Sequence, residues 1–144
     1  MTRSTGPRRS RIAFSASTAA SSAPNPATRG ASCTITTRPV FAADEIDASV
    51  EVLDVRTLKP LDEETLLASV AKTGRVVIVQ EAPRVAGFGA ELAAVVAEKA
   101  ILDLRGPVLR VTGYDVPYPY WQIEDAYMPS VDRVVDAARR LLEF

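Results

Sequence analysis

The chain has 144 residues, 47% of them hydrophobic, which is enough for one domain with an apolar core. It contains no histidine and only one cysteine, Cys33. Within this chain, that composition excludes a Ser-His-Asp or Cys-His catalytic set, an internal disulfide and a metal site built from several cysteines. No apolar run approaches the length of a membrane-spanning helix, so we expect no membrane association.

The net charge of −1 conceals two different segments. Residues 1–40 carry six arginines and no acid (+6), whereas residues 41–144 carry 11 basic and 18 acidic residues (−7). The first segment is rich in Ser, Thr, Ala and Pro without periodicity, so we predict that residues 1–40 are disordered and that the folded domain spans 41–144. Three interpretations of the tail remain: a non-native segment translated from GC-rich DNA, a mitochondrial transit peptide, or, least favoured, a nucleic-acid-binding arm.

The remaining residues predict alternating strands and helices. The end of a helix at 41–49 precedes a strand at 50–55, a helix starting at Asp62 and stopping at Gly74, a strand at 76–79, a helix at 89–102, a strand at 108–111 and an amphipathic helix starting at Ser130. This order predicts parallel strands with right-handed crossovers.

The stretch from Arg75 to Ala94 is the best candidate for a working loop. A β-branched run at 76–79 fits a strand buried on both faces, and Pro83 ends it. Glu81 could act as a general acid or base, or, as we favour, could hold backbone amides or an arginine. Gly87 and Gly89 could cradle a phosphate at a helix N-terminus, but the usual phosphate-loop spacings are absent, so close backbone packing is favoured.

An aromatic loop at 114–129 reads YDVPYPYWQIEDAYMP and holds the only tryptophan. Its acids, Asp115, Glu124 and Asp125, could bind a metal, but they lack ligand spacing, and solvated acids are the favoured interpretation. Exposed tyrosine and tryptophan side chains are typical of partner surfaces. We therefore expect Tyr118, Tyr120 and Trp121 to lie in a subunit interface.

Three motifs carry a resemblance to a known family. The stretches VEVLDVRTLKPLDEETLL, RVVIVQEAPRVAGFGAELAA and PVLRVTGYDVPYPY resemble the C-terminal, transketolase-type domain of a 2-oxoacid dehydrogenase beta subunit, of branched-chain or pyruvate dehydrogenase type. The resemblance implies a three-layer α/β/α fold with a mostly parallel sheet. It also implies an interface loop formed by Gln80, Glu81, Ala82, Pro83, Gly87, Phe88 and Gly89.

The resemblance implies a thiamine-diphosphate and magnesium enzyme that decarboxylates a 2-oxoacid and transfers the acyl group to lipoamide. Its implied partners are an alpha subunit and a second beta subunit in a heterotetramer, and a lipoyl acyltransferase core. The cofactor and catalytic residues lie in a domain that this sequence does not match, so we expect this chain alone to bind no cofactor or metal and to be inactive. The implied location is the bacterial cytoplasm, or the mitochondrial matrix if the tail is a transit peptide.

The sequence also departs from the family pattern before Phe41. We expect the first strand, an antiparallel edge strand, to be missing, as in a truncated fragment. Two alternatives stay open: a standalone α/β interaction module, and the equivalent domain of a sugar-phosphate thiamine enzyme.

Overall fold

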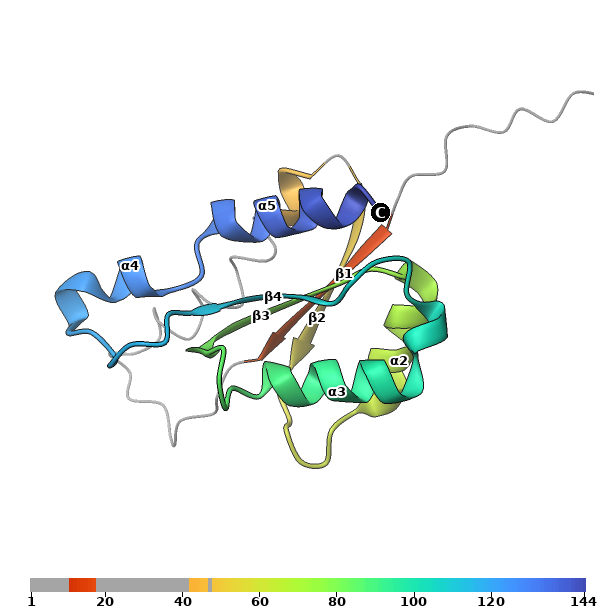
Figure 1. Cartoon of the computed structure of the whole chain (residues 1–144), viewed down its shortest axis with the longest axis horizontal. Helices are drawn as coiled ribbons and strands as arrows, with labels where there is room; N and C mark the ends of the chain where they lie inside the picture. The colour runs from red at the N-terminus through yellow and green to blue at the C-terminus, as the bar shows by residue number, and fades with distance from the viewer. Residues whose placement is uncertain (1–10, 18–41, 47) are drawn as a thin grey trace, which may run out of the picture.

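The computed structural model describes residues 11–17, 42–46 and 48–144, and its centre is a sheet of four parallel strands. The strands are β1 (Arg11–Ser17), β2 (Ser49–Val55), β3 (Val76–Pro83) and β4 (Leu109–Gly113), in the spatial order β2-β1-β3-β4. Helices α2 (Glu63–Thr73) and α3 (Gly89–Lys99) cover one face, and α5 (Val131–Leu142) covers the other (Figure 1). The predicted three-layer α/β/α fold is confirmed.

Strand β3 explains why the core has two halves. Its side chains alternate between the two faces of the sheet. Val77 and Val79 pack toward α5, and Val76 and Ile78 pack toward α2 and α3. All four are at most 1% exposed. The unbroken β-branched run therefore marks a strand covered by helices on both sides, as predicted.

Local signals in the sequence set the ends of the helices. The Asp62 carboxylate accepts a hydrogen bond from the Thr65 amide at 3.0 Å and so caps α2. Gly74 ends that helix in the left-handed conformation, with φ 70°. Ser130 caps α5 through the Arg133 amide. A turn of 3-10 helix (Ile101–Asp103) follows α3. Another (Trp121–Ile123) precedes the short helix α4 (Glu124–Tyr127) inside the aromatic loop.

Strand β1 corrects two expectations from the sequence. Residues Arg11–Ser17 were predicted to be disordered, and the first strand was expected to be missing and to belong antiparallel at an edge. Instead β1 lies inside the sheet and pairs in parallel with both β2 and β3. In the sequence, Ile12 and Phe14 alternate with smaller or polar residues, a period-two pattern too short to stand out in an Arg- and Ser-rich segment. The rest of the predicted tail, 1–10 and 18–40, lies outside the described residues.

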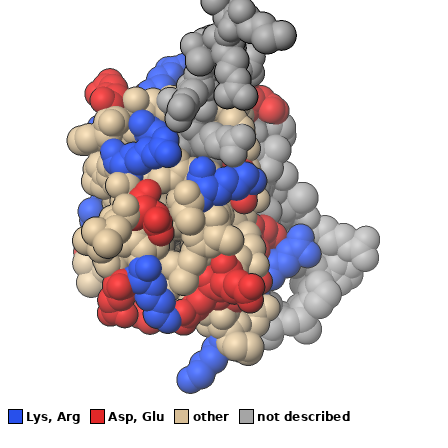
Figure 2. Space-filling view, turned by 90° about the vertical axis from the view of Figure 1, so that its right-hand side faces the viewer, with Lys and Arg blue, Asp and Glu red and all other residues tan. Residues whose placement is uncertain are grey.

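The end of the molecule where the strands begin has a mixed surface. Figure 2 shows basic and acidic side chains interspersed around a broad uncharged area on that face. Lys99 of α3 forms one ion pair with Glu63 of α2, which ties these two helices together. Exposed pairs of this kind contribute little to stability.

Candidate subunit interface at the carboxyl edge of the sheet

The side chain of Gln80 organises the loop that follows β3. It is 1% exposed, and its Nε2 donates hydrogen bonds to the carbonyl oxygens of Ala82 (3.2 Å) and Pro83 (2.9 Å). Its Oε1 accepts a hydrogen bond from the Gly89 amide at 2.5 Å. One buried side chain thus joins the end of β3 to the first residue of α3, and its polar groups are bound within the chain.

The two glycines of the loop leave room for Gln80. A Cβ on Gly89 would lie 2.5 Å from Gln80 Oε1 and 2.9 Å from Ile78 Cγ2. A Cβ on Gly87 would overlap the Gln80 amide and lie 2.5 Å from the Pro83 carbonyl oxygen. The favoured sequence interpretation, close packing rather than a phosphate cradle, agrees with this geometry. In open α/β sheets, the carboxyl edge is the usual ligand site. On its β3 side, this edge is filled by Gln80.

Tyrosines from the aromatic loop lie over the ends of β3 and β4. Tyr118 packs edge-on against Tyr127 with ring centroids 5.0 Å apart, and Tyr114 contacts the same ring at 6.5 Å. Tyr127 is buried and touches Gly113 at the end of β4. Its ring therefore anchors the loop to the sheet, whereas Tyr114 and Tyr118 remain about half exposed, at 50% and 54%.

Carboxylates surround these tyrosines. The Tyr118 hydroxyl donates a 2.6 Å hydrogen bond to Glu124 Oε1. Desolvation raises the pKa of Tyr118 well above its usual range, and the hydrogen bond to Glu124 and the negative charge of Glu81 raise it further. The pKa of Tyr127 is also raised, first by burial and then by the charges of Glu81 and Asp115. The fold thus brings Glu81 close to Glu124, which lies 43 positions later in the sequence.

Arg133 of α5 fixes the beginning of the aromatic loop. Its guanidinium lies 4.8 Å from the centroid of the Tyr114 ring, and Nη2 donates a 2.8 Å hydrogen bond to the Thr112 carbonyl. The negative face of an aromatic ring attracts a cation that lies over it. The aromatic loop is therefore held by α5 at one end and by Tyr127 at the other.

The predicted interface residues separate into two groups. Gln80, Gly87 and Gly89 are buried and shape the loop from within. Partly exposed or exposed residues form the surface: Glu81, Ala82, Pro83, Phe88, Tyr118 and Tyr120. Trp121 begins a 3-10 turn in the same loop. Sequence reasoning missed Arg133 and the anchor Tyr127, because no local pattern shows that α5 and the end of β4 meet.

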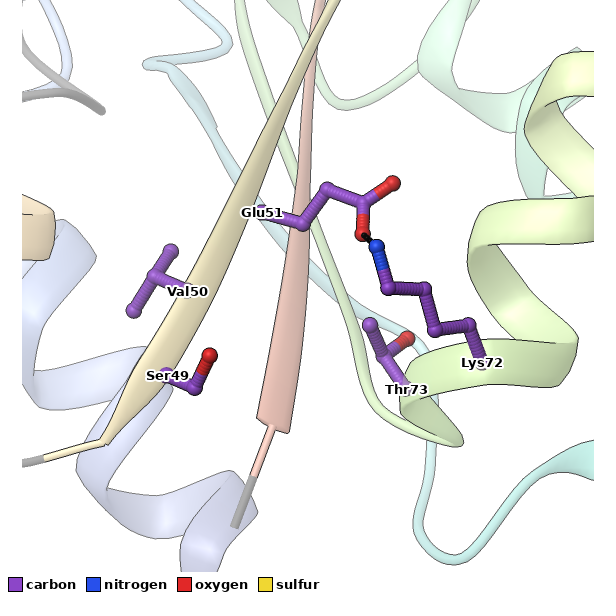
Figure 3. Close-up of a pocket in the computed structure, with 5 residues that line it drawn as sticks. All are labelled: Ser49, Val50, Glu51, Lys72 and Thr73. Atoms are coloured by element: carbon purple, nitrogen blue, oxygen red, sulfur yellow. Dashed lines mark ion pairs between the residues drawn. The ribbon is translucent and has the colours of Figure 1, made fainter. Parts of the chain in front are cut away.

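A shallow hollow lies away from this edge, at the start of β2. Ser49, Val50, Glu51, Lys72 and Thr73 line it (Figure 3). Lys72 at the end of α2 reaches Glu51 of β2 in an ion pair of 2.5 Å. The Thr73 hydroxyl donates to the Ser69 carbonyl at 2.8 Å. The ion pair ties α2 to the sheet, whereas the Thr73 hydrogen bond lies within α2. Neither contact forms a nucleophile with a base.

Two other kinds of site are not found among the described residues. The described residues include no group of three or more acidic or cysteine side chains arranged to hold a metal ion. In particular, Asp115, Glu124 and Asp125 do not converge on one point as ligands. Among the helices of the described ranges, none combines the length and apolar character needed to cross a bilayer.

The parallel sheet, its two helical layers and the motifs at its carboxyl edge define the class of protein. The chain belongs to the transketolase C-terminal domain family, whose model matches residues 30–134. This match begins before the domain boundary predicted at residue 41.

Two curated relatives are similar to the chain over most of its length. The chain is 49% identical over 106 residues to the pyruvate dehydrogenase E1 component subunit beta of Staphylococcus epidermidis, which covers 72% of this chain and 33% of the relative. It is 46% identical over 107 residues to the protein of the same name from Leifsonia xyli subsp. xyli, covering 74% of this chain and 32% of the relative. The resemblance to a C-terminal domain of a 2-oxoacid dehydrogenase beta subunit is confirmed, and the chain spans about a third of these relatives' length.

A solved structure supports the fold alone. "Split gene transketolase, inactive beta4 tetramer" superimposes with a TM-score of 0.68 at 24% sequence identity, covering 94% of this chain and 39% of that chain. At this identity the likeness concerns the architecture and not the activity.

Proposed function

We propose that this chain acts as the assembly domain of the beta subunit of a thiamine-diphosphate-dependent 2-oxoacid dehydrogenase. One observation carries the proposal: the polar groups of the Gln80 side chain are bound within the chain, while tyrosines beside the loop face outward. Such a loop is rigid and presents a surface. A catalytic loop would instead aim a polar group at a substrate.

Thiamine diphosphate and magnesium are the cofactors of the proposed enzyme. Protein-bound magnesium is usually held by one or two carboxylates together with waters and the phosphates of its ligand. We propose that the cofactor belongs to other parts of the whole enzyme, and that this chain without them does not turn over a 2-oxoacid.

The whole enzyme that we propose uses pyruvate, since the relatives cited above are pyruvate dehydrogenase subunits. A branched-chain 2-oxoacid is the alternative. The proposed partners are an alpha subunit and a second beta subunit in a heterotetramer, and a lipoyl acyltransferase core. The proposed location is the bacterial cytoplasm, as the named relatives are bacterial.

Co-expression tests the proposal. The full chain is produced with a tagged alpha subunit of a bacterial pyruvate dehydrogenase, and the captured material is sized by analytical ultracentrifugation. We expect stoichiometric capture without pyruvate turnover. Separate sedimentation of the two chains, or turnover by the 144-residue chain alone, would contradict the proposal. Capture by the partner half of a split transketolase instead would favour a sugar-phosphate enzyme.

One structural feature favours a second candidate, a standalone interaction module. Strand β1 fills the interior of the sheet, so the described strands form one continuous ladder. If the purified chain is folded and monomeric before it meets the alpha subunit, the module is the better description. A chain that folds only when it is co-expressed with the alpha subunit supports the assembly domain.

A further inference from the structure

The aromatic loop presents a set of exposed apolar side chains that come from one short segment. We define the tyrosine surface as Tyr114, Val116, Tyr118, Tyr120 and Ile123, which are 50, 55, 54, 88 and 59% exposed. Large apolar groups gathered in this way mark contact surfaces more often than isolated ones do. Two prolines, Pro117 and Pro119, alternate with the tyrosines and restrict the backbone.

The charge around this surface is negative. Residues 114–132 include Asp115, Glu124, Asp125 and Asp132 and contain no lysine or arginine. Glu81 of β3 adds a further carboxylate, and its charge acts on both Tyr118 and Tyr127. An approaching group thus meets carboxylates together with the electron-rich faces of tyrosine rings.

Two arginines that flank the aromatic loop in the sequence are engaged in contacts with the chain itself. Arg133 lies over the Tyr114 ring and donates to the Thr112 carbonyl. Arg110 of β4 donates from Nη1 to the Arg84 carbonyl at 3.2 Å. Both cations hold backbone in place, and within the described part of the chain neither of them pairs with Glu81 or Glu124. A cation from another molecule would therefore complement this surface.

From this arrangement we propose that the tyrosine surface binds a cationic segment of a partner polypeptide, with arginine or lysine side chains lying over Tyr118 and Tyr120 and pairing with Glu81 and Glu124. The inference rests on the proposed function as an assembly domain and adds the chemistry of the partner. Opposite charge favours encounter and orientation, and cation–π contact adds affinity. Phosphate-bearing partners such as nucleic acid would be repelled. The fixed loop also lowers the entropic cost of binding.

Peptide binding to the full chain provides the test. The probes are three labelled peptides of about ten residues, in which leucine alternates with arginine, glutamate or serine, and binding is followed by fluorescence anisotropy. We expect the arginine peptide to bind tightest and to weaken as salt increases. Equal binding of all three peptides, or binding of the arginine peptide that is insensitive to salt, would overturn the proposal.

Variants locate the binding on the surface. Tyr120→Ser and Glu124→Gln should each weaken binding of the arginine peptide about two- to fivefold, the size of an exposed cation–π or ion-pair contact. The matched control, Glu98→Gln, removes an exposed carboxylate from α3 and should leave binding unchanged. An equal loss with Glu98→Gln would show attraction to net charge only and would refute the site.

The two proposals can fail separately. If the alpha subunit is captured and the Tyr120 and Glu124 variants bind it as well as the parent chain does, the assembly function stands and the tyrosine surface is not the contact. If the arginine peptide binds at this surface but no alpha subunit is captured, the surface stands and the assembly function fails.

Discussion

The backbone amide of Gly89 donates a hydrogen bond to the side-chain oxygen of Gln80, and so the first residue of α3 is fixed to the end of β3. Since Gln80 also donates to Ala82 and Pro83, its side chain replaces the backbone contacts that this irregular loop cannot make for itself. The loop owes its shape to the side-chain amide of Gln80.

Replacing Gln80 with methionine should therefore destabilise the fold. The substitution Gln80→Met keeps an unbranched side chain of similar length but leaves the buried Gly89 amide without its acceptor. A buried unsatisfied group costs about 1–3 kcal/mol, so we expect a loss of about 2–3 kcal/mol in urea unfolding. The control, Gln122→Met, alters an exposed glutamine and should have little effect on the unfolding midpoint. Equal midpoints for Gln80→Met and the parent chain would contradict this role.

Replacing Ala86 should have the opposite effect and stabilise the fold. It has a φ of 59°, in the left-handed region that alanine adopts with strain. Ala86→Gly should relieve that strain and raise the free energy of unfolding by up to about 1 kcal/mol, less what glycine loses in chain entropy. Ala90→Gly, in the first turn of α3, is the matched control and should lower stability by about 0.5–1 kcal/mol. The measurements are thermal and urea unfolding. If both variants change the free energy of unfolding in the same direction, the result would count against strain at Ala86.

Gly113 should tolerate no side chain. A Cβ at this position would overlap the Glu81 carbonyl oxygen and lie 2.6 Å from Tyr127 Cζ. Because a backbone carbonyl cannot move aside, Gly113→Ala should cost about 1–3 kcal/mol and change the near-ultraviolet circular dichroism of the tyrosines. Gly106→Ala is the milder comparison, since its Cβ would meet Leu141 Cδ1 and Phe144 Cβ at 3.1 Å, a distance that a shift of a few tenths of an ångström relieves. Similar losses for both variants would argue against a tight contact at Gly113.

The tyrosines beside Glu81 should resist ionisation. The pKa values of Tyr118 and Tyr127 are raised in the folded chain, mainly by desolvation. In the unfolded chain, a tyrosine has a pKa of about 10. Below that pH both states keep the phenol proton, so the contribution to stability is constant. Above it the unfolded chain ionises first, and the free energy of unfolding falls as pH rises.

A spectrophotometric titration of the tyrosinate band checks this expectation. Two of the four tyrosines should ionise late or together with alkaline unfolding. Tyr118→Phe should remove one late step, and Glu124→Gln should bring the pKa of Tyr118 closer to its usual value. A single step for all tyrosines near the ordinary pKa would refute the environment described for Tyr118.

Short-range features were predictable because their physical causes are local. The cap at Asp62, the stop at Gly74 and the cap at Ser130 each depend on residues a few positions away, and the structure places them as expected. The buried strand at 76–79 could be predicted because four consecutive β-branched residues exclude a solvent-facing side.

The site was less predictable because its contacts join distant positions. Gln80 and Gly89 were recognised as members of one loop. The sequence did not show that the buried side chain of Gln80 would form hydrogen bonds with the backbone groups of that loop. The grouping of Glu81 with Tyr118 and Glu124 requires β3 and the aromatic loop to meet. Strand β1 was missed because seven residues of mixed polarity do not reveal that two later strands will enclose them.

The interior position of β1 also constrains the order of folding. Strands β2 and β3 both pair with β1, and in the spatial order of the described sheet they are not neighbours. During synthesis, β1 leaves the ribosome first but gains its second partner only after β3 has emerged. The early β-strand must wait for contacts that are distant in sequence, which slows closure of the sheet. Until then at least one edge of β1 stays unpaired, and a newly made chain is most open to misassociation in that interval.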